Sequence, residues 1–236
     1  MIKVIVTGTS SGIGEAIALR LLHLPNAELI GVSRTQTIEH HRYTHKFIDL
    51  SDLEQVQLFQ FPACENNDEI ILINNSGVIG DIAPVGKKSD RAIIETFNIN
   101  TIAPALLMNA FVNYYQNHTG LLKIINISSG AGRHPVASWA DYCASKAAID
   151  MFSEVIYEEQ SGPNLKIISL APGIVDTAMQ TDIREADSAL FPLSAHFKQL
   201  KHTGQLSSSS EVAKQIVDLI TGQISWPDVI SDVRDF

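Results

Sequence analysis

The chain has little cysteine, little positive charge and no long apolar run. Only two cysteines, Cys64 and Cys143, occur in 236 residues, which argues against a disulfide framework and favours a reducing cytoplasm. Acidic residues outnumber basic ones, 26 to 17, and the formal net charge is −9. Because nucleic acids and anionic membranes favour basic surfaces, we expect neither as a partner.

The apolar segments are too short to cross a bilayer. The longest, residues 99–112, is interrupted by Asn100, Thr101 and Asn109, whereas a spanning helix needs ~20 apolar residues. The opening MIKVIVTG lacks the basic segment, apolar core and cleavage site of a signal peptide. We therefore expect a soluble cytoplasmic protein.

Short β-branched runs alternate with longer helical patterns. Strands are predicted at residues 2–6, 28–33, 69–74, 121–128, 165–171 and 228–231, and helices near 12–24, 51–60, 88–116, 138–160 and 210–221. Strands that are apolar at nearly every position are typical of a parallel sheet covered on both faces. The pattern predicts a single α/β domain over residues 1–236, a Rossmann fold whose doubly wound, mainly parallel β-sheet has helices on both faces.

One connection is too short for a full crossover helix. Residues 34–46 separate the second strand from a short third strand at 45–49, so we expect that helix to be truncated or missing. His40, His41 and His45 lie in this segment without nearby cysteines or a regular ligand spacing. We interpret them as a solvated loop and expect no metal.

A glycine-rich turn follows the first strand. Its sequence TGTSSGIG places glycines where the backbone must turn tightly and approach a phosphate, at the start of a helix whose free N–H groups attract anions. This placement predicts a dinucleotide site. The expected contacts from the turn are Gly8, Ser10, Ser11, Gly12, Ile13 and Gly14.

The end of the second strand indicates which dinucleotide is bound. A carboxylate there would bond both ribose hydroxyls of NAD, but this chain has Ser33 and Arg34. A guanidinium can pair with a 2′-phosphate through charge-assisted hydrogen bonds. We therefore expect NADP(H) as the cofactor, with Arg34 as its main 2′-phosphate ligand.

Further motifs resemble those of the short-chain dehydrogenase/reductase family, in the family's order. They are TGTSSGIG, Asp49–Leu50, NNSG at 74–77, NIN around Asn100, NISSG, YCASK and APGIVDT at 171–177. The resemblance covers nearly the whole chain. It implies further cofactor contacts at Asp49, Leu50, Asn75, Gly77, Tyr142, Lys146, Pro172, Gly173, Val175 and Thr177.

The resemblance also implies a catalytic set. Tyr142 would be the general acid, and Lys146 would lower its pKa and bind the nicotinamide ribose. Ser129 would orient the substrate carbonyl, and Asn100 would hold a relay water. We prefer Ser129 because the family's serine usually lies thirteen residues before its tyrosine, and Ser128 stays the alternative.

Physical chemistry supports the tyrosine–lysine pair independently. Residues four apart share one face of a helix, so Lys146 can lie near the Tyr142 hydroxyl. A nearby cation lowers a phenol's pKa from about 10 towards neutrality. The stretch SWAD at 138–141 has the form of a capping box, which predicts a helix start just before the tyrosine.

The segment 178–206 is expected to form a substrate lid. Its mainly apolar side chains either line the pocket or pack a core within the lid; they are Met179, Ile183, Leu190, Phe191, Leu193, His196 and Phe197. Trp139 and Met179 are the candidate substrate contacts.

Several stretches are most similar to the sepiapterin reductase and benzil reductase branch of the family, among them SWADYCASKAAIDMF and PGIVDTAMQTDIR. This similarity implies NADPH-dependent reduction of one carbonyl of a small 1,2-diketone or a sepiapterin-like substrate. Two alternatives stay open: a 3-ketoacyl-thioester reductase, and a regulator that binds NADP(H) without catalysis.

The apolar helix around residues 100–112 bears on assembly. In the family, this helix and the tyrosine helix form a dimer interface, which implies a homodimer or a tetramer built from it. Burial within a monomer is the alternative. The charged ending DVRDF is interpreted as a terminal tail.

Overall fold

The computed structural model describes residues 1–160 and 164–236. Within these ranges seven strands form one parallel sheet in the order β3-β2-β1-β4-β5-β6-β7. Their bounds are β1 Ile2–Thr7, β2 Ala27–Ser33, β3 Tyr43–Phe47, β4 Glu69–Asn74, β5 Leu122–Ile127, β6 Leu165–Ala171 and β7 Ile230–Asp232. The strand order reverses between β1 and β4, where open α/β sheets bind their ligands. The predicted doubly wound fold is confirmed.

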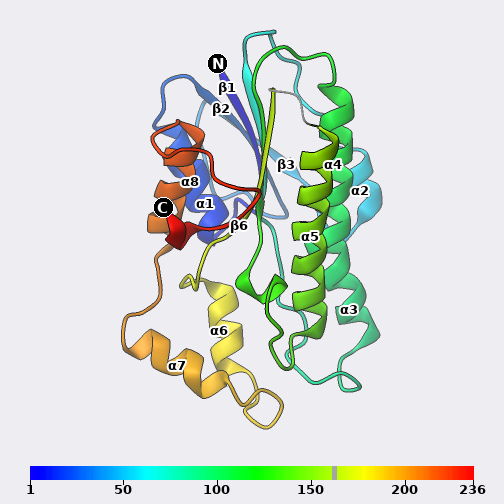
Figure 1. Cartoon of the computed structure of the whole chain (residues 1–236), viewed down its shortest axis with the longest axis vertical. Helices are drawn as coiled ribbons and strands as arrows, with labels where there is room; N and C mark the ends of the chain where they lie inside the picture. Colours follow the sequence, from blue (N-terminus) through cyan, green and yellow to red (C-terminus); the bar gives the residue numbers. More distant parts are fainter. Residues whose placement is uncertain (161–163) are drawn as a thin grey trace.

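Helices cover both faces of the sheet (Figure 1). The α-helices are α1 Gly12–Leu22, α2 Leu53–Gln57, α3 Asp90–Phe97, α4 Ala103–Tyr114, α5 Ala140–Glu159, α6 Ala178–Glu185, α7 Ser194–His202 and α8 Ser209–Ile220. Helices α1 and α8 lie on one face, and α2, α4 and α5 on the other. Helices α6 and α7 project beyond the end of the sheet. Among the described helices, none is long and apolar enough to cross a membrane.

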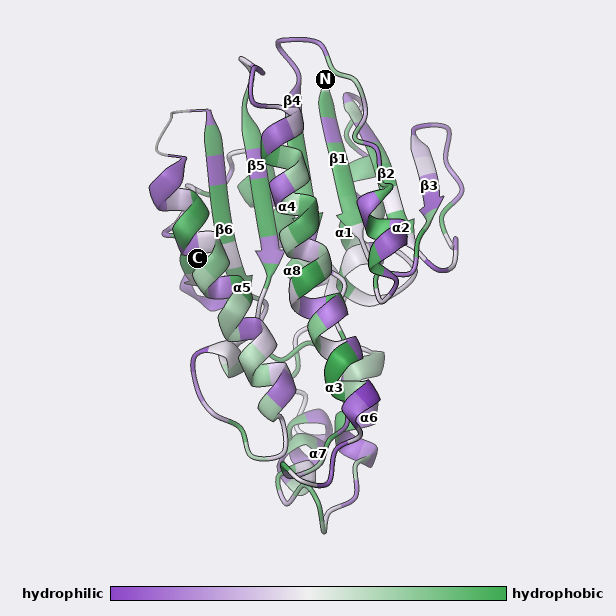
Figure 2. Ribbon diagram, turned by 90° about the vertical axis from the view of Figure 1, so that its right-hand side faces the viewer, coloured by the Kyte–Doolittle hydropathy of each residue, from purple (hydrophilic) through white to green (hydrophobic). Residues whose placement is uncertain are grey.

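Strand alternation explains why the central strands are apolar throughout. Val4 and Val6 pack with α1 and α8, whereas Ile5 packs with α4 and α5, and all three are at most 1% exposed. Because successive side chains point to opposite faces, a strand buried on both sides needs apolar residues at every position. Figure 2 shows this difference: the central strands are largely hydrophobic, and the edge strand β3 is polar.

The connection from β2 to β3 contains no helix, as expected from its length. The third strand begins earlier than predicted, at Tyr43 instead of residue 45, and pairs with β2 from Leu29 to Ser33. The interpretation of His45 as a loop residue was therefore wrong: it is a strand residue paired with Gly31. Ile38 packs the connection onto the core and is 3% exposed.

The helix predicted over 88–116 is continuous but not uniform. It consists of α3, a π-helical turn η1 (Asn98–Ile102) and α4. Such single π turns inside α-helices are frequent at functional sites, and this one contains Asn100. Helix α8 begins with a reciprocal capping box formed by Ser208 and Glu211.

The capping box predicted at residues 138–141 is wrong, although α5 does begin at Ala140. Ser138 has a φ of 72° and donates its hydroxyl to the carbonyl of Leu190 in the lid, at 2.6 Å. The carboxylate of Asp141 instead pairs with Lys88 at 2.6 Å. Both cap side chains are thus used in tertiary contacts that the local sequence pattern does not reveal.

Candidate active site

Two cavities lie near the start of α1. One of about 590 Å³ lies beside the first turn of α1, and a larger one of about 770 Å³ is lined by most of the predicted site residues. The larger cavity opens where the strands end. Gly8 follows β1, Asn75 follows β4, Ser128 follows β5 and Pro172 follows β6, and all four line it. Every predicted cofactor, catalytic and substrate residue lines this cavity except Gly14 and Asn100.

The glycine turn forms one end of the cavity. Gly8 and Gly12 have φ values of 75° and 63°, in the left-handed region that favours glycine. Gly14 lies behind the cavity instead of lining it. A Cβ on Gly14 would come within 2.3 Å of Asn75 Nδ2 and the Gly8 carbonyl, so this glycine allows α1 to pack closely on the turn.

Ser33, Arg34, Asp49 and Leu50 line the cavity beyond the turn. Burial alone would raise the pKa of the Asp49 carboxyl. Hydrogen bonds from Ser51, together with the charge of Arg34, outweigh burial and hold that pKa below its usual value. Arg34 and the ionised carboxylate of Asp49 therefore line the same part of the cavity. An anion bound by Arg34 would lie near the negative charge of Asp49.

Tyr142 and Lys146 lie on the buried face of α5, 7% and 4% exposed. The Lys146 Nζ is 5.9 Å from the Tyr142 ring centroid and donates to the carbonyl of Ile127 at 2.8 Å. Strand β5 thus fixes the ammonium beside the phenol.

The expected lowering of the tyrosine pKa does not occur. Burial raises the pKa of Tyr142, and the Ser129 side chain offsets this only in part. Burial also lowers the pKa of Lys146 to about 8, against the opposing charge of Asp150. The physical reason is desolvation, which disfavours both charged forms in this buried pair.

The structure separates the two candidate serines. Ser129 interacts with Tyr142, and its Oγ accepts from the backbone N–H of Ala131 at 3.1 Å. Ser128 Oγ is buried and has no hydrogen-bond partner within the described residues. Both serines line the cavity, but only the Ser129 side chain acts on the pKa of the Tyr142 phenol.

Asn100 does not line the main cavity but a small pocket of mixed polarity, which Lys146 also lines. Its amide nitrogen donates to the Val78 carbonyl at 2.8 Å and to Ser145 Oγ at 3.0 Å, and its oxygen accepts from Val78 N–H at 2.9 Å. The side chain therefore joins the loop after β4 to α5, at the residue before Lys146.

Aromatic rings form one wall of the cavity. Trp139 stacks on Phe191 with ring centroids 5.5 Å apart and meets the Tyr142 ring edge-on at 5.7 Å. Trp139, Met179 and Phe197 line the cavity, whereas Phe191 is fully buried behind them. Leu193 is 43% exposed. The lid therefore both lines the pocket and packs a core of its own.

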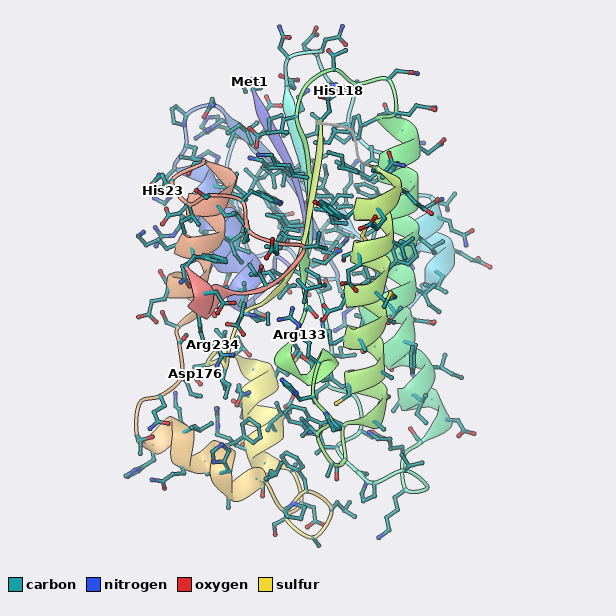
Figure 3. The ribbon with its side chains drawn as sticks, in the orientation of Figure 1. Met1, His23, His118, Arg133, Asp176 and Arg234 are labelled. Atoms are coloured by element: carbon teal, nitrogen blue, oxygen red, sulfur yellow. The ribbon has the colours of Figure 1, made fainter. Side chains whose placement is uncertain are left out.

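The C-terminal segment was not predicted to belong to the site. Asp232 and Arg234 line the same cavity, and Arg234 pairs with Asp232 through Nη2 at 2.7 Å. Arg133 donates to the Ser231 carbonyl at 3.1 Å and so secures this segment from the loop after Ser129. Figure 3 shows Arg133, Arg234 and Asp176 near the middle of the molecule, with Met1 and His118 at its top.

Asp150 was also missed, although its spacing is informative. It follows Lys146 by four residues, as Lys146 follows Tyr142, so the three share one face of α5. Its carboxylate accepts from Ser169 Oγ at 2.6 Å and from Arg133 Nε at 3.1 Å.

Within residues 1–160 and 164–236, no group of three or more His, Cys, Asp or Glu side chains is arranged to hold a metal.

Residues 3–188 match the family described as short chain dehydrogenase, and the chain belongs to this family of oxidoreductases. It is 34% identical over 224 residues to benzil reductase ((S)-benzoin forming) of Bacillus subtilis (strain 168), covering 92% of each chain. It is 29% identical over 240 residues to sepiapterin reductase of Rattus norvegicus, covering 92% of this chain and 90% of that protein. The similarity to this branch is confirmed.

Solved structures show the same fold. The KRED1-Pglu enzyme aligns with a TM-score of 0.82 at 24% identity, covering 95% of this chain and 97% of that one. A 4-hydroxyisoleucine dehydrogenase complexed with NADH aligns with a TM-score of 0.78 at 22% identity, covering 98% and 97%.

Proposed function

We propose that the protein is an NADPH-dependent reductase that converts one carbonyl of a small hydrophobic 1,2-diketone or sepiapterin-like substrate to an alcohol. The observation that carries the proposal is the single cavity that joins Tyr142, Ser129 and Lys146 to the glycine turn and Arg34. Carbonyl reduction needs a proton donor and a dinucleotide side by side, and this cavity offers residues suited to both.

The residues of the cavity fit a nicotinamide dinucleotide. The turn from Gly8 to Ile13 presents backbone N–H groups suited to a pyrophosphate, and Arg34 suits a 2′-phosphate. Lys146 would bind the nicotinamide ribose, and Thr177 the carboxamide. When bound, the cofactor supplies the hydride.

The protein's own part is to hold the carbonyl and deliver a proton. Because burial raises the pKa of Tyr142, its hydroxyl stays protonated at neutral pH and can donate to the alkoxide that forms. Ser129, beside the phenol, would hold the carbonyl oxygen. Such general acid catalysis contributes roughly 10²–10⁴-fold in rate.

The aromatic wall supports the choice of substrate. Trp139, Met179 and Phe197 offer an apolar surface for a ring beside the reacting carbonyl. The two named relatives, benzil reductase and sepiapterin reductase, favour a 1,2-dicarbonyl over a ketoacyl thioester. We assign the lid function to residues 178–206, which the bridge between Val175 and Ser207 anchors beside the cavity.

We also propose that the protein pairs with a second copy through α4 and α5. Large apolar side chains of these helices are exposed; they are Tyr114, Met151, Phe152, Val155 and Tyr157. Contact between two such faces would bury them.

Both cysteines are free, which suits the proposed cytoplasmic location.

The proposal is tested by following the loss of reduced-nicotinamide absorbance with an aromatic 1,2-diketone. NADPH and NADH are compared at equal concentration, and a 3-ketoacyl thioester is run in parallel. We expect turnover of the diketone with a preference for NADPH. Turnover of only the thioester would favour a 3-ketoacyl-thioester reductase. NADPH binding without turnover of any carbonyl would favour a regulator that binds NADP(H) without catalysis.

Replacing Asp150 with asparagine should move the alkaline limb of the kcat/KM profile to lower pH. The Asp150 carboxylate raises the pKa of Lys146, which burial has lowered to about 8. In the native enzyme the ammonium is lost as pH rises through that value, and without the carboxylate it is lost earlier. Asp218→Asn, a carboxylate of α8 remote from the cavity, is the control. An unchanged or more alkaline limb in Asp150→Asn would contradict this role.

A further inference from the structure

The face of β3 on the α1 side of the sheet carries an aromatic row in place of the missing crossover helix. Tyr43, His45 and Phe47 alternate along the strand, so their side chains share one face. Their rings follow one another, 6.0 Å from Tyr43 to His45 and 4.5 Å from His45 to Phe47. Tyr43 packs against the core shared with α1, while Phe47 is 66% exposed.

Tyr43 and His45 form a hydrogen-bonded chain that links the glycine turn to the end of β2, two parts of the proposed cofactor site. Thr9 Oγ1 is 2.9 Å from Tyr43 Oη, which is 2.9 Å from His45 Nδ1. His45 Nε2 is 3.1 Å from the carbonyl oxygen of Ser33. Thr9 lies within the glycine turn, and Ser33 immediately precedes Arg34.

The protons along this chain have one consistent arrangement for a neutral imidazole. The Ser33 carbonyl can only accept, so His45 Nε2 donates and Nδ1 accepts. Tyr43 then donates to His45 and accepts from Thr9. Burial raises the pKa of Tyr43 above its ordinary value, so the phenol keeps its proton at neutral pH.

Gly31 makes this arrangement possible. A Cβ at Gly31 would lie 1.9 Å from Tyr43 Oη and 2.6 Å from Thr9 Oγ1, so only glycine lets the phenol cross β2 to the turn. Thr9 is 1% exposed, and a buried hydroxyl left without its partner is costly. The contact between Tyr43 Oη and Thr9 Oγ1 is therefore tightly packed against Gly31.

We propose that Tyr43 and His45 are positioning residues that set the preference for the 2′-phosphate. They hold the Ser33–Arg34 backbone at a fixed distance from the glycine turn, a restraint that a crossover helix would otherwise supply. An edge strand without such a cover opens easily, and a ligand group held in advance binds more tightly than one ordered on binding. This inference rests on the proposed use of NADP(H).

The test measures the dissociation constants of NADPH and NADH by nicotinamide fluorescence, without substrate. Tyr43→Phe keeps the ring and removes both hydrogen bonds of the hydroxyl. We expect NADPH to bind about tenfold more weakly, because Arg34 is then ordered only on binding. NADH, which lacks the 2′-phosphate, should change by less than about threefold.

Two further variants sharpen the test. His45→Ala should reproduce the selective loss, and the double variant should lose no more than either single one, because one chain is broken in each case. Thr44→Val removes a hydroxyl from the opposite, exposed side of the same strand and should leave both constants unchanged. Melting temperatures report on stability alone.

The outcomes separate this inference from the proposed function. Equal weakening of NADPH and NADH, with a lowered melting temperature, would show a merely structural role and overturn the inference. An unchanged ratio of the two constants, or additive losses in the double variant, would also overturn it. If the native protein binds NADH but not NADPH, the proposed cofactor fails together with the inference.

Discussion

Replacing Tyr142 with phenylalanine is expected to lower kcat for diketone reduction by roughly 10²–10⁴-fold. The substitution removes the hydroxyl that interacts with Ser129 and leaves the ring that packs edge-on against Trp139. The loss should therefore appear in kcat, with the dissociation constant of NADPH changed by no more than about threefold.

The matched control is Tyr157→Phe, which removes a hydroxyl from the same helix at a position that is 56% exposed. This variant should retain the native kcat. A Tyr142→Phe enzyme with native kcat would show that another group or a solvent water supplies the proton. A loss that lies entirely in KM would assign Tyr142 to substrate binding instead.

The largest expected loss of stability comes from Lys88→Met. Lys88 and Asp141 form an ion pair with both side chains 2% exposed. Removing the ammonium leaves a buried carboxylate without its countercharge, at a cost of roughly 3–5 kcal/mol in the free energy of unfolding. For a chain of this size, that corresponds to a fall in melting temperature of about 10 °C.

Two variants test this explanation. Lys214→Met breaks a pair with Asp218 in which the lysine is 60% exposed, so it should cost less than about 0.5 kcal/mol. Adding Asp141→Asn to Lys88→Met removes the unpaired charge and should recover part of the lost stability. If Lys88→Met and Lys214→Met are equally mild, the buried pair does not fasten the loop after β4 to the start of α5.

The periodic parts of the fold were predictable because their pattern is local. Val4 and Val6 pack into the core on one face of the sheet, and Ile5 packs into the core on the other. A strand that is apolar at every position therefore predicts burial on both faces. The shortness of residues 34–46 likewise predicts the missing helix. The position of the glycine turn predicts one end of the cavity.

Contacts between distant segments were not predictable in this way. Ser138 and Asp141 match a capping box, but the lid carbonyl of Leu190 and the buried Lys88 compete for their side chains. The inclusion of Asp232 and Arg234 in the cavity depends on the pairing of β7 with β6, which carries the tail back to the site.

The direction of the tyrosine pKa shows a further limit. Spacing places Lys146 beside Tyr142 but says nothing of how deeply the pair is buried. In the structure, burial raises the pKa of Tyr142 and the Ser129 side chain offsets this only in part, while burial lowers the pKa of Lys146 against the charge of Asp150. Sequence spacing can therefore identify partners, whereas the balance between charge and burial needs the packed structure.

The most direct test of the proposed function is the transfer of hydrogen from the cofactor to the substrate. NADPH labelled with deuterium at both C4 positions is incubated with the protein and an aromatic 1,2-diketone, and the product is analysed by mass spectrometry. We predict a hydroxyketone that carries a single deuterium on the new alcohol carbon, formed at similar rates by the native protein and the Tyr157→Phe control and roughly 10²–10⁴-fold more slowly by Tyr142→Phe. Consumption of NADPH without a labelled hydroxyketone would contradict the assignment of the protein as a diketone reductase.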